Sequence, residues 1–419
     1  MKQITVAISS VCVTLLLCIV LLFAANWLAE KHLRANPEIL MTRDQRINEN
    51  TRSVREAMIP KDKIAEWYAL DSAEELSAMW DEFYNAGAIF ESYVHFRARA
   101  TEGKYYGMTE AGYRKVRDQG PWPIDKGNYN IFFFGGSTSF GVGPYWATVA
   151  SYLQDRMNKS DAVGRPVKVY NFGRSGYFTG QEVILFQRLL TNGHVPDMVV
   201  FFDGLNDFCW VDGQPSSWQM LARHFNSVNE AALKQAAGHG IITEWQKLLS
   251  FMETLPLTRY LNATLARIGE EPVPQYTEPS KAVEEKPEPD ETLAAIIDRY
   301  LSIKKQIEGM SAAFGISPVF VWQPIPTYKY DTSFHLFNPD RLGCHINSKV
   351  GYPMMAKRIE EADEFGTNFV WGADMQENLK EPLYIDAFHY TAPMSERVAE
   401  LINNAVLERK LHSLDMANQ

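Results

Sequence analysis

Hydrophobic and polar residues alternate in blocks along much of this chain, and the block lengths indicate short buried strands separated by amphipathic helices. The strand-like apolar runs are Ile131–Phe134, Val167–Asn171, Met198–Phe202 and Pro318–Gln323. The longer amphipathic stretches predict helices at Tyr145–Met157, Gln181–Leu190, Leu293–Phe314 and Met394–Leu411. Short apolar strands joined by helices are typical of crossover units, so the pattern predicts an α/β fold with a parallel sheet covered on both faces.

The N-terminus has a different pattern, because Ile4–Trp27 contains no charged residue. A transmembrane helix needs roughly 20 apolar residues, whereas the apolar part of a secretory signal peptide usually has roughly 7–15 and ends in an A-x-A-like site. The sequence Ala24-Ala25-Asn26 is a poor cleavage site. We therefore expect residues 4–27 to form an uncleaved, single-pass transmembrane anchor.

The basic residues on either side of this anchor do not by themselves predict that the C-terminal part is exported. Lys2 precedes the apolar stretch, whereas Lys31, Arg34, Arg43 and Arg46 follow it, which by itself argues against export of the C-terminal part. A short N-terminal anchor on a large domain nevertheless usually exports that domain. We expect the body of the protein to be periplasmic or otherwise extracytoplasmic.

Beyond the anchor, the chain divides by composition. Residues 28–127 are polar, partly helical around Ala73–Phe83, and contain no catalytic pattern, so they form an N-terminal extension. The strand–helix alternation occupies residues 128–412 and is interrupted at about 211–290, where a helical patch at Ile241–Leu255 precedes a Pro- and Glu-rich stretch. Such a composition predicts an exposed, mobile loop, with a partner-binding arm as the alternative.

Charge and cysteine content exclude some functions and leave others open. The formal net charge is −10 and no basic block occurs, so nothing indicates a nucleic-acid partner. No H-E-x-x-H, phosphate-binding or dinucleotide-binding glycine motif is present, so we expect no metal and no cofactor. Cys12 and Cys18 lie in the apolar stretch, whereas Cys209 and Cys344 either pair in an oxidising compartment or remain free and buried.

Candidate chemistry lies where the predicted strands end, because a parallel sheet carries its functional residues at the carboxyl ends of its strands. The first strand runs into FFFGGSTSFG. Gly135 and Gly136 allow a sharp turn, and Ser137 would then begin a helix, where backbone N–H groups favour negative charge. Thr138 and Ser139 are assigned no role beyond starting that helix.

The other strand ends add further polar groups. Gly176 follows the second strand in VYNFGRSGY, and Asn206 follows the third in FFDGLNDF. Near the C-terminus, YIDAFHYTAP places Asp386 three residues before His389, so that the carboxylate can accept a hydrogen bond from the imidazole. Each feature alone also fits a simple turn or a capping residue.

Taken together and in this order, the four blocks resemble the SGNH, or GDSL-like, hydrolase superfamily. Gly135–Gly141 is similar to the family's G-G-S-T-x-x-G block, and Gly136 stands where many members carry Asp. Gly176 matches the second block, Gly204–Asp207 matches G-x-N-D, and Asp386 with His389 matches D-x-x-H. The resemblance covers roughly residues 128–412 and implies a three-layer sandwich with a flavodoxin-like parallel sheet.

The resemblance also implies roles for individual residues. Ser137 would be the nucleophile, His389 the general base and Asp386 the residue that orients it. The oxyanion hole would combine the backbone N–H groups of Ser137 and Gly176 with the Asn206 side chain, and no metal would take part.

The expected function is a membrane-anchored serine esterase acting on O-acyl esters, with envelope glycans or lipids as candidate substrates. One alternative is an acyltransferase that uses the same residues for O-acetyl transfer to a glycan. A second alternative is a non-catalytic, anchored subunit of a membrane assembly, in which residues 28–127 or 211–290 bind a protein partner.

Overall fold

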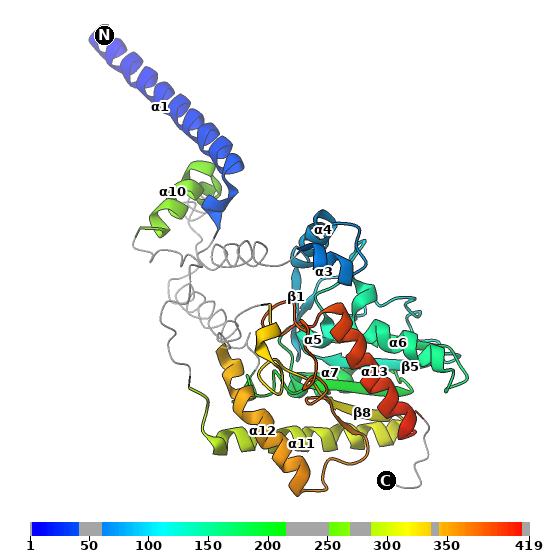
Figure 1. Ribbon diagram of the computed structural model, residues 1–419. Coiled ribbons are helices and arrows are strands. Elements are labelled where there is room, and N and C mark those ends of the chain that lie inside the picture. The colour runs from blue at the N-terminus through cyan, green and yellow to red at the C-terminus, as the bar shows by residue number, and fades with distance from the viewer. Residues whose placement is uncertain (1, 42–60, 215–250, 269–285, 337–342, 413–419) are drawn as a thin grey trace. The chain divides into compact units, whose positions relative to one another are not determined.

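The computed structural model describes residues 2–41, 61–214, 251–268, 286–336 and 343–412. The chain divides into two compact units. The smaller combines Met1–Met58 with His224–Lys281, and the larger combines Ile59–Arg223 with Ala282–Gln419. Figure 1 shows the elements of both units along the chain.

In the smaller unit, a helix from the expected insertion packs against the N-terminal helix. The elements are α1 (Lys2–Ala35), η1 (Pro37–Leu40) and α10 (Pro256–Ala266). The backbone N–H of Leu257 donates to Asn26 Oδ1 at 3.1 Å, and the rings of His32 and Tyr260 meet edge to face at 5.6 Å. Part of the expected loop is therefore a packed helix, whereas most of Ile241–Leu255 lies outside the described residues.

Helix α1 is compatible with the expected anchor. Its stretch Leu16–Ala35 is long and apolar enough to cross a membrane, although a signal sequence near an N-terminus passes the same test. The helix continues past Trp27, the end of the expected anchor, and reaches Ala35.

The larger unit is built on a parallel sheet, as predicted. Its five strands are β5 (Tyr129–Gly135), β6 (Val167–Asn171), β7 (Met198–Asp203), β8 (Ser317–Trp322) and β9 (Phe369–Trp371). They are all parallel and lie in the order β6-β5-β7-β8-β9. The chain leaves β5 toward β6 and returns on the other side at β7, so the switch point of this flavodoxin-like sheet lies between β5 and β7.

Helices cover both faces of the sheet, which confirms the three-layer α/β architecture. Alternate residues of β5 point to opposite faces: Phe132 and Phe134 join one apolar cluster, and Ile131 and Phe133 join the other. The first face is covered by α7 (Thr179–Thr191), α11 (Asp290–Phe314) and α12 (Ile346–Glu361), the second by α6 (Val149–Ser160) and α13 (Ala392–Glu408). Helix α12 was not predicted, because Pro353 interrupts its pattern.

Residues 61–127 belong to the same compact unit as the sheet. They form α3 (Lys61–Trp67), α4 (Ala73–Tyr84) and two short antiparallel pairs, β1 (Ala88–Glu91) with β2 (His95–Ala98) and β3 (Thr101–Glu102) with β4 (Gly107–Met108). Tyr68 and Trp80 share an apolar cluster with Val142 and Ile385. The described part of the extension therefore packs on two loops next to the predicted site residues.

Short elements complete the larger unit. They are α5 (Ser137–Phe140), η2 (Tyr145–Ala147), η3 (Thr332–Phe334) and η4 (Gly343–His345).

Candidate active site

Ser137 lies at a tight turn between β5 and α5, where the sequence placed it. Gly135 ends the strand with φ of 148°, and a Cβ there would lie 2.6 Å from the carbonyl oxygen of Phe202. Gly136 is the N-cap of α5, and half-buried Ser137 is the first residue of that helix. Gly135 is thus required both by its backbone conformation and by its close approach to Phe202.

The residues after Ser137 hold this turn in place, a role that the sequence did not indicate. Thr138 Oγ1 donates to Gln323 Oε1 at 2.6 Å, and Ser139 Oγ donates to the Gly136 carbonyl at 2.7 Å. A Cβ on Gly173 would lie 2.3 Å from Ser139 Oγ, so this glycine allows the loop after β6 to approach the turn. The hydroxyl groups beside Ser137 are therefore structural.

Asp386 and His389 form the predicted pair within a short loop. Asp386 Oδ2 lies 2.6 Å from His389 Nδ1, and Oδ1 accepts hydrogen bonds from the N–H groups of Phe388 and His389 at 2.9 and 2.8 Å. Burial works against ionisation of Asp386, but the His389 charge and these hydrogen bonds outweigh it and lower the pKa of the carboxyl. An ionised Asp386 therefore fixes the imidazole with Nε2 directed away from it.

The loops that carry Ser137 and His389 converge on the end of β8. The hydroxyl of Tyr390 lies 3.1 Å from Gln323 Oε1, the oxygen that also accepts from Thr138, and 2.7 Å from the carbonyl oxygen of Pro324. His389 Nε2 is buried and has no hydrogen-bond partner among the residues that the structure describes. One side-chain amide thus links the neighbours of both predicted catalytic residues.

Asn206 is hydrogen-bonded to the turn that contains Gly176. Gly176 has φ of 73° in a turn closed by the Tyr177 N–H, which donates to the carbonyl of Arg174 at 3.2 Å. Asn206 Nδ2 donates to the Tyr177 carbonyl at 2.6 Å, and a Cβ on Gly136 would lie 2.3 Å from the same Nδ2. The Asn206 amide therefore lies between the Gly176 turn and the backbone that leads into Ser137.

Arg114 is a structural residue of the site that sequence reasoning missed. It is fully buried among the rings of Phe83, Tyr106 and Phe140, and its guanidinium donates to the carbonyl groups of Phe140, Gly141 and Gly143. Burial lowers its pKa to about 10. A single arginine in a polar stretch gives no periodic signal, so only the fold shows that it holds the loop after α5.

The loop that carries Asn206 is also fixed from the other side. A disulfide joins Cys209 to Cys344, Asn347 Nδ2 donates to the carbonyl of Phe208 at 3.1 Å, and Ser348 Oγ donates to that of Leu205 at 3.2 Å. The sequence left the pairing of the two cysteines open, and the structure pairs them.

His345 lies beside this disulfide. A ring nitrogen of His345 lies within 4.8 Å of both sulfur atoms. Among the described residues, these three side chains are the only group that could hold a metal ion by spacing. The two sulfur atoms are bonded to each other, however, and a disulfide does not offer thiolate ligands. Burial and the nearby charge of His389 lower the pKa of His345 to about 4. Its ring packs on Phe388 at 4.3 Å, so His345 is a neutral packing residue next to the loop that carries His389.

Three buried carboxyl groups lie close to the Asn206 loop: Glu182, Asp203 and Asp207. Burial raises the pKa of each, and the negative charge of Asp207 adds to the effect on the other two. Asp207 accepts hydrogen bonds from the N–H groups of Gly204 and Thr179, whereas both carboxyl oxygens of Glu182 are buried without a hydrogen-bond partner among the described residues.

This cluster predicts a stability change with pH. Because burial raises the pKa of Glu182 and of Asp203, the folded protein binds more protons at this cluster than the unfolded chain does above about pH 4. Stability therefore falls as pH rises, by about 1.4 kcal/mol per pH unit for each extra proton. Glu182→Gln should therefore reduce the fall in melting temperature between pH 5.5 and 8. Exposed Glu66→Gln is the control. An unchanged fall in Glu182→Gln would contradict the prediction.

Comparison with known proteins identifies the family. The family model described as GDSL-like Lipase/Acylhydrolase matches residues 131–402. No curated protein matches the chain.

Among solved structures, similar chains include an acetylxylan esterase from Geobacillus stearothermophilus, at 13% identity over 67% of this chain and 93% of that one, with a TM-score of 0.31. An α/β hydrolase enzyme from the metagenome of Lake Arreo is also 13% identical, over 68% and 96%, with a TM-score of 0.29. A two-domain esterase active on acetylated mannans is 13% identical, over 68% and 50%, with a TM-score of 0.32.

Proposed function

Because the chain belongs to the family of GDSL-like lipases and acylhydrolases, we propose that it hydrolyses O-acyl esters through Ser137, His389 and Asp386. The observation that carries this proposal is the pair formed by Asp386 and His389 at 2.6 Å, with the opposite imidazole nitrogen buried and without a hydrogen-bond partner among the described residues. That nitrogen is the atom that a serine hydrolase uses as its base.

In the proposed reaction, Ser137 Oγ forms a bond to the acyl carbon while its proton passes to His389 Nε2. The ester bond then breaks, and the leaving alkoxide takes that proton. Water attacks the acyl-enzyme in the same way, releasing the acid and restoring Ser137. Asp386 stays ionised throughout and stabilises the imidazolium, consistent with its lowered pKa.

The negative oxygen of the intermediate would be stabilised by three donors: the N–H groups of Ser137 and Gly176, and Asn206 Nδ2. The Asn206 amide nitrogen carries two hydrogens, and the described contact with the Tyr177 carbonyl uses one. The second is the proposed oxyanion donor.

Asn206→Ala should lower kcat by about 10²–10³-fold, the usual cost of losing one oxyanion donor. Hydrolysis of p-nitrophenyl acetate measures this loss. Asn158→Ala is a suitable control, because the Asn158 side chain also donates to backbone carbonyls, those of Gln154 and Val167. Asn158 belongs to α6 and bonds to the first residue of β6, at the opposite end of that strand from the site. A control variant that lost as much kcat as Asn206→Ala would argue against a specific donor role.

A fluorophosphonate probe tests the proposed nucleophile directly. The full chain, purified in detergent, is labelled and digested, and the modified residue is identified by mass spectrometry. We expect the adduct on Ser137. An adduct on another serine, or no adduct, would refute the assignment, and absence of labelling would favour the non-catalytic alternative.

The same labelled serine would serve acyl transfer, in which a sugar hydroxyl replaces water. Product analysis with an added glycan acceptor separates the two reactions: hydrolysis releases free acid, whereas transfer yields acylated glycan. We propose hydrolysis, since the family is named for lipases and acylhydrolases.

We further propose that the larger unit lies outside the cytoplasm, held by α1. The disulfide between Cys209 and Cys344 supports this, because disulfides persist in oxidising compartments. A phosphatase that is active only after export, fused to the C-terminus, should therefore be active in cells. Activity of a cytoplasmic reporter at the same position, with an inactive phosphatase fusion, would show the opposite orientation.

A further inference from the structure

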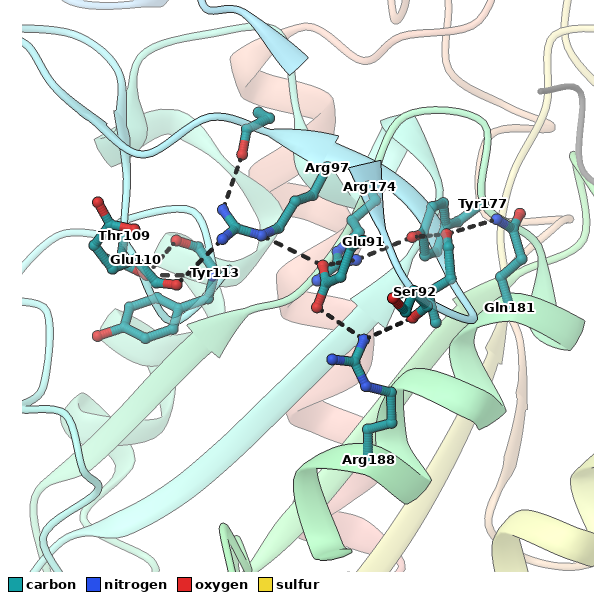
Figure 2. A network of polar contacts seen from close by, with 12 residues as sticks. Glu91, Ser92, Arg97, Thr109, Glu110, Tyr113, Arg174, Tyr177, Gln181 and Arg188 are labelled. Atoms are coloured by element: carbon teal, nitrogen blue, oxygen red, sulfur yellow. Dashed lines mark hydrogen bonds and ion pairs between the residues drawn. The ribbon is translucent and has the colours of Figure 1, made fainter. Parts of the chain in front are cut away.

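A single carboxylate in the N-terminal extension is surrounded by arginines. Figure 2 shows Glu91 facing Arg97, Arg174 and Arg188. Its oxygens lie 3.3, 2.9 and 2.9 Å from nitrogens of these three side chains. Glu91 ends β1, Arg97 lies in β2 and Arg188 in α7, so one residue joins the hairpin of the extension to the hydrolase domain.

Arg174 is the member of this group that reaches the candidate active site. Its side chain is 2% exposed, and its backbone N–H donates to the carbonyl of Gly135 at 2.9 Å. Its own carbonyl accepts from Tyr177 and so closes the turn that contains Gly176. The guanidinium also donates to the hydroxyl of Tyr177 at 2.9 Å.

The hairpin holds the far side of the same turn. The hydroxyl of Tyr177 donates to the carbonyl of Val94, and Gln181 Nε2 donates to that carbonyl at 3.2 Å. Gly112 (φ of 86°) borders Arg174 as well, since a Cβ there would lie 3.2 Å from Nη2 of the arginine. The side chain of Arg174 is thus enclosed by residues of the extension.

We infer that Glu91 is a positioning residue for the oxyanion hole: through Arg174 it fixes the turn that presents the Gly176 N–H. This rests on the proposed function, in which Gly176 is an oxyanion donor. The β1–β2 hairpin would then support catalysis without contact with substrate.

Charge balance explains why the carboxylate matters. One negative charge faces three guanidinium groups, so the site already carries an excess of positive charge. Glu91→Gln would leave buried Arg174 without its counter-charge, and a buried unpaired cation moves toward water or another partner. Because Arg174 forms part of the turn, such a movement would displace Gly176.

The test compares Glu91→Gln and Glu91→Asp with wild type in the full chain, using p-nitrophenyl acetate. Glu91→Gln should lower kcat by about 10- to 100-fold, the cost of a displacement of about 1 Å, with KM within about twofold of wild type. Glu91→Asp, which keeps the charge on a shorter side chain, should give an intermediate kcat. Glu102→Gln is the matched control, because Glu102 pairs with Lys115 on the exposed side of the same extension.

The outcomes separate this inference from the proposed function. Full activity of Ser137→Ala would overturn both. An inactive Ser137→Ala beside a folded Glu91→Gln variant with wild-type kcat would overturn the positioning role alone, as would a Glu102→Gln variant that loses as much kcat.

A melting temperature will show whether Glu91→Gln folds. If it does not, a second variant, Tyr177→Phe, tests the positioning role. Tyr177→Phe keeps the ring and removes only the hydroxyl between Arg174 and Val94. It should lower kcat by about three- to tenfold at unchanged KM, as expected for the loss of one hydrogen bond. An unchanged kcat in Tyr177→Phe would then overturn the inference.

Discussion

Replacing Ser137 with alanine is expected to lower kcat for p-nitrophenyl acetate by about 10⁶-fold, the loss seen when a serine hydrolase loses its nucleophile. Alanine removes only the hydroxyl at the first position of α5, so the turn at Gly135 and Gly136 should stay intact. Binding of substrate should change little, so the loss should appear in kcat.

The matched control is Ser175→Ala, which removes an exposed hydroxyl from the neighbouring turn of Gly176. It should keep wild-type kcat. Equal losses in the two variants would point to general damage at this edge of the sheet, and a loss of less than about tenfold in Ser137→Ala would contradict the nucleophile assignment.

The second large effect is expected for Asp386→Asn, which should lower kcat by about 10⁴-fold with little change in KM. Asp386 accepts from His389 Nδ1 and from two backbone N–H groups. An amide nitrogen facing Nδ1 would donate instead of accept, which favours the tautomer protonated at Nε2. The imidazole could then not accept the proton of Ser137.

Asp331→Asn is the control for this prediction. Asp331 Oδ1 accepts from the N–H of Ser333 in a similar short loop, but the residue is exposed and has no role in the proposed chemistry. Because an amide oxygen can still accept that bond, kcat should be unchanged. Retention of activity in Asp386→Asn would show that another group orients His389.

The four strands with continuous apolar runs were predicted to within two residues of their observed ends, because a fully buried parallel strand has a strong local signature. β9 was missed, since its three residues are too short to form a pattern. The contribution of the extension was missed for another reason: Tyr68, Glu91 and Arg114 act through contacts with distant residues, and their neighbours in sequence give no sign of this.

The sequence by itself determined the fold class, the strand ends at which Ser137, Gly176 and Asn206 lie, and the spacing of Asp386 and His389. These depend on periodicity and on local order along the chain. Only the tertiary structure decided that Gln323 meets Thr138 across 185 residues, that Cys209 pairs with Cys344, and that the β1–β2 hairpin holds the Gly176 turn. The physical reason is that such contacts are made by side chains that approach one another only once the sheet and its loops have formed.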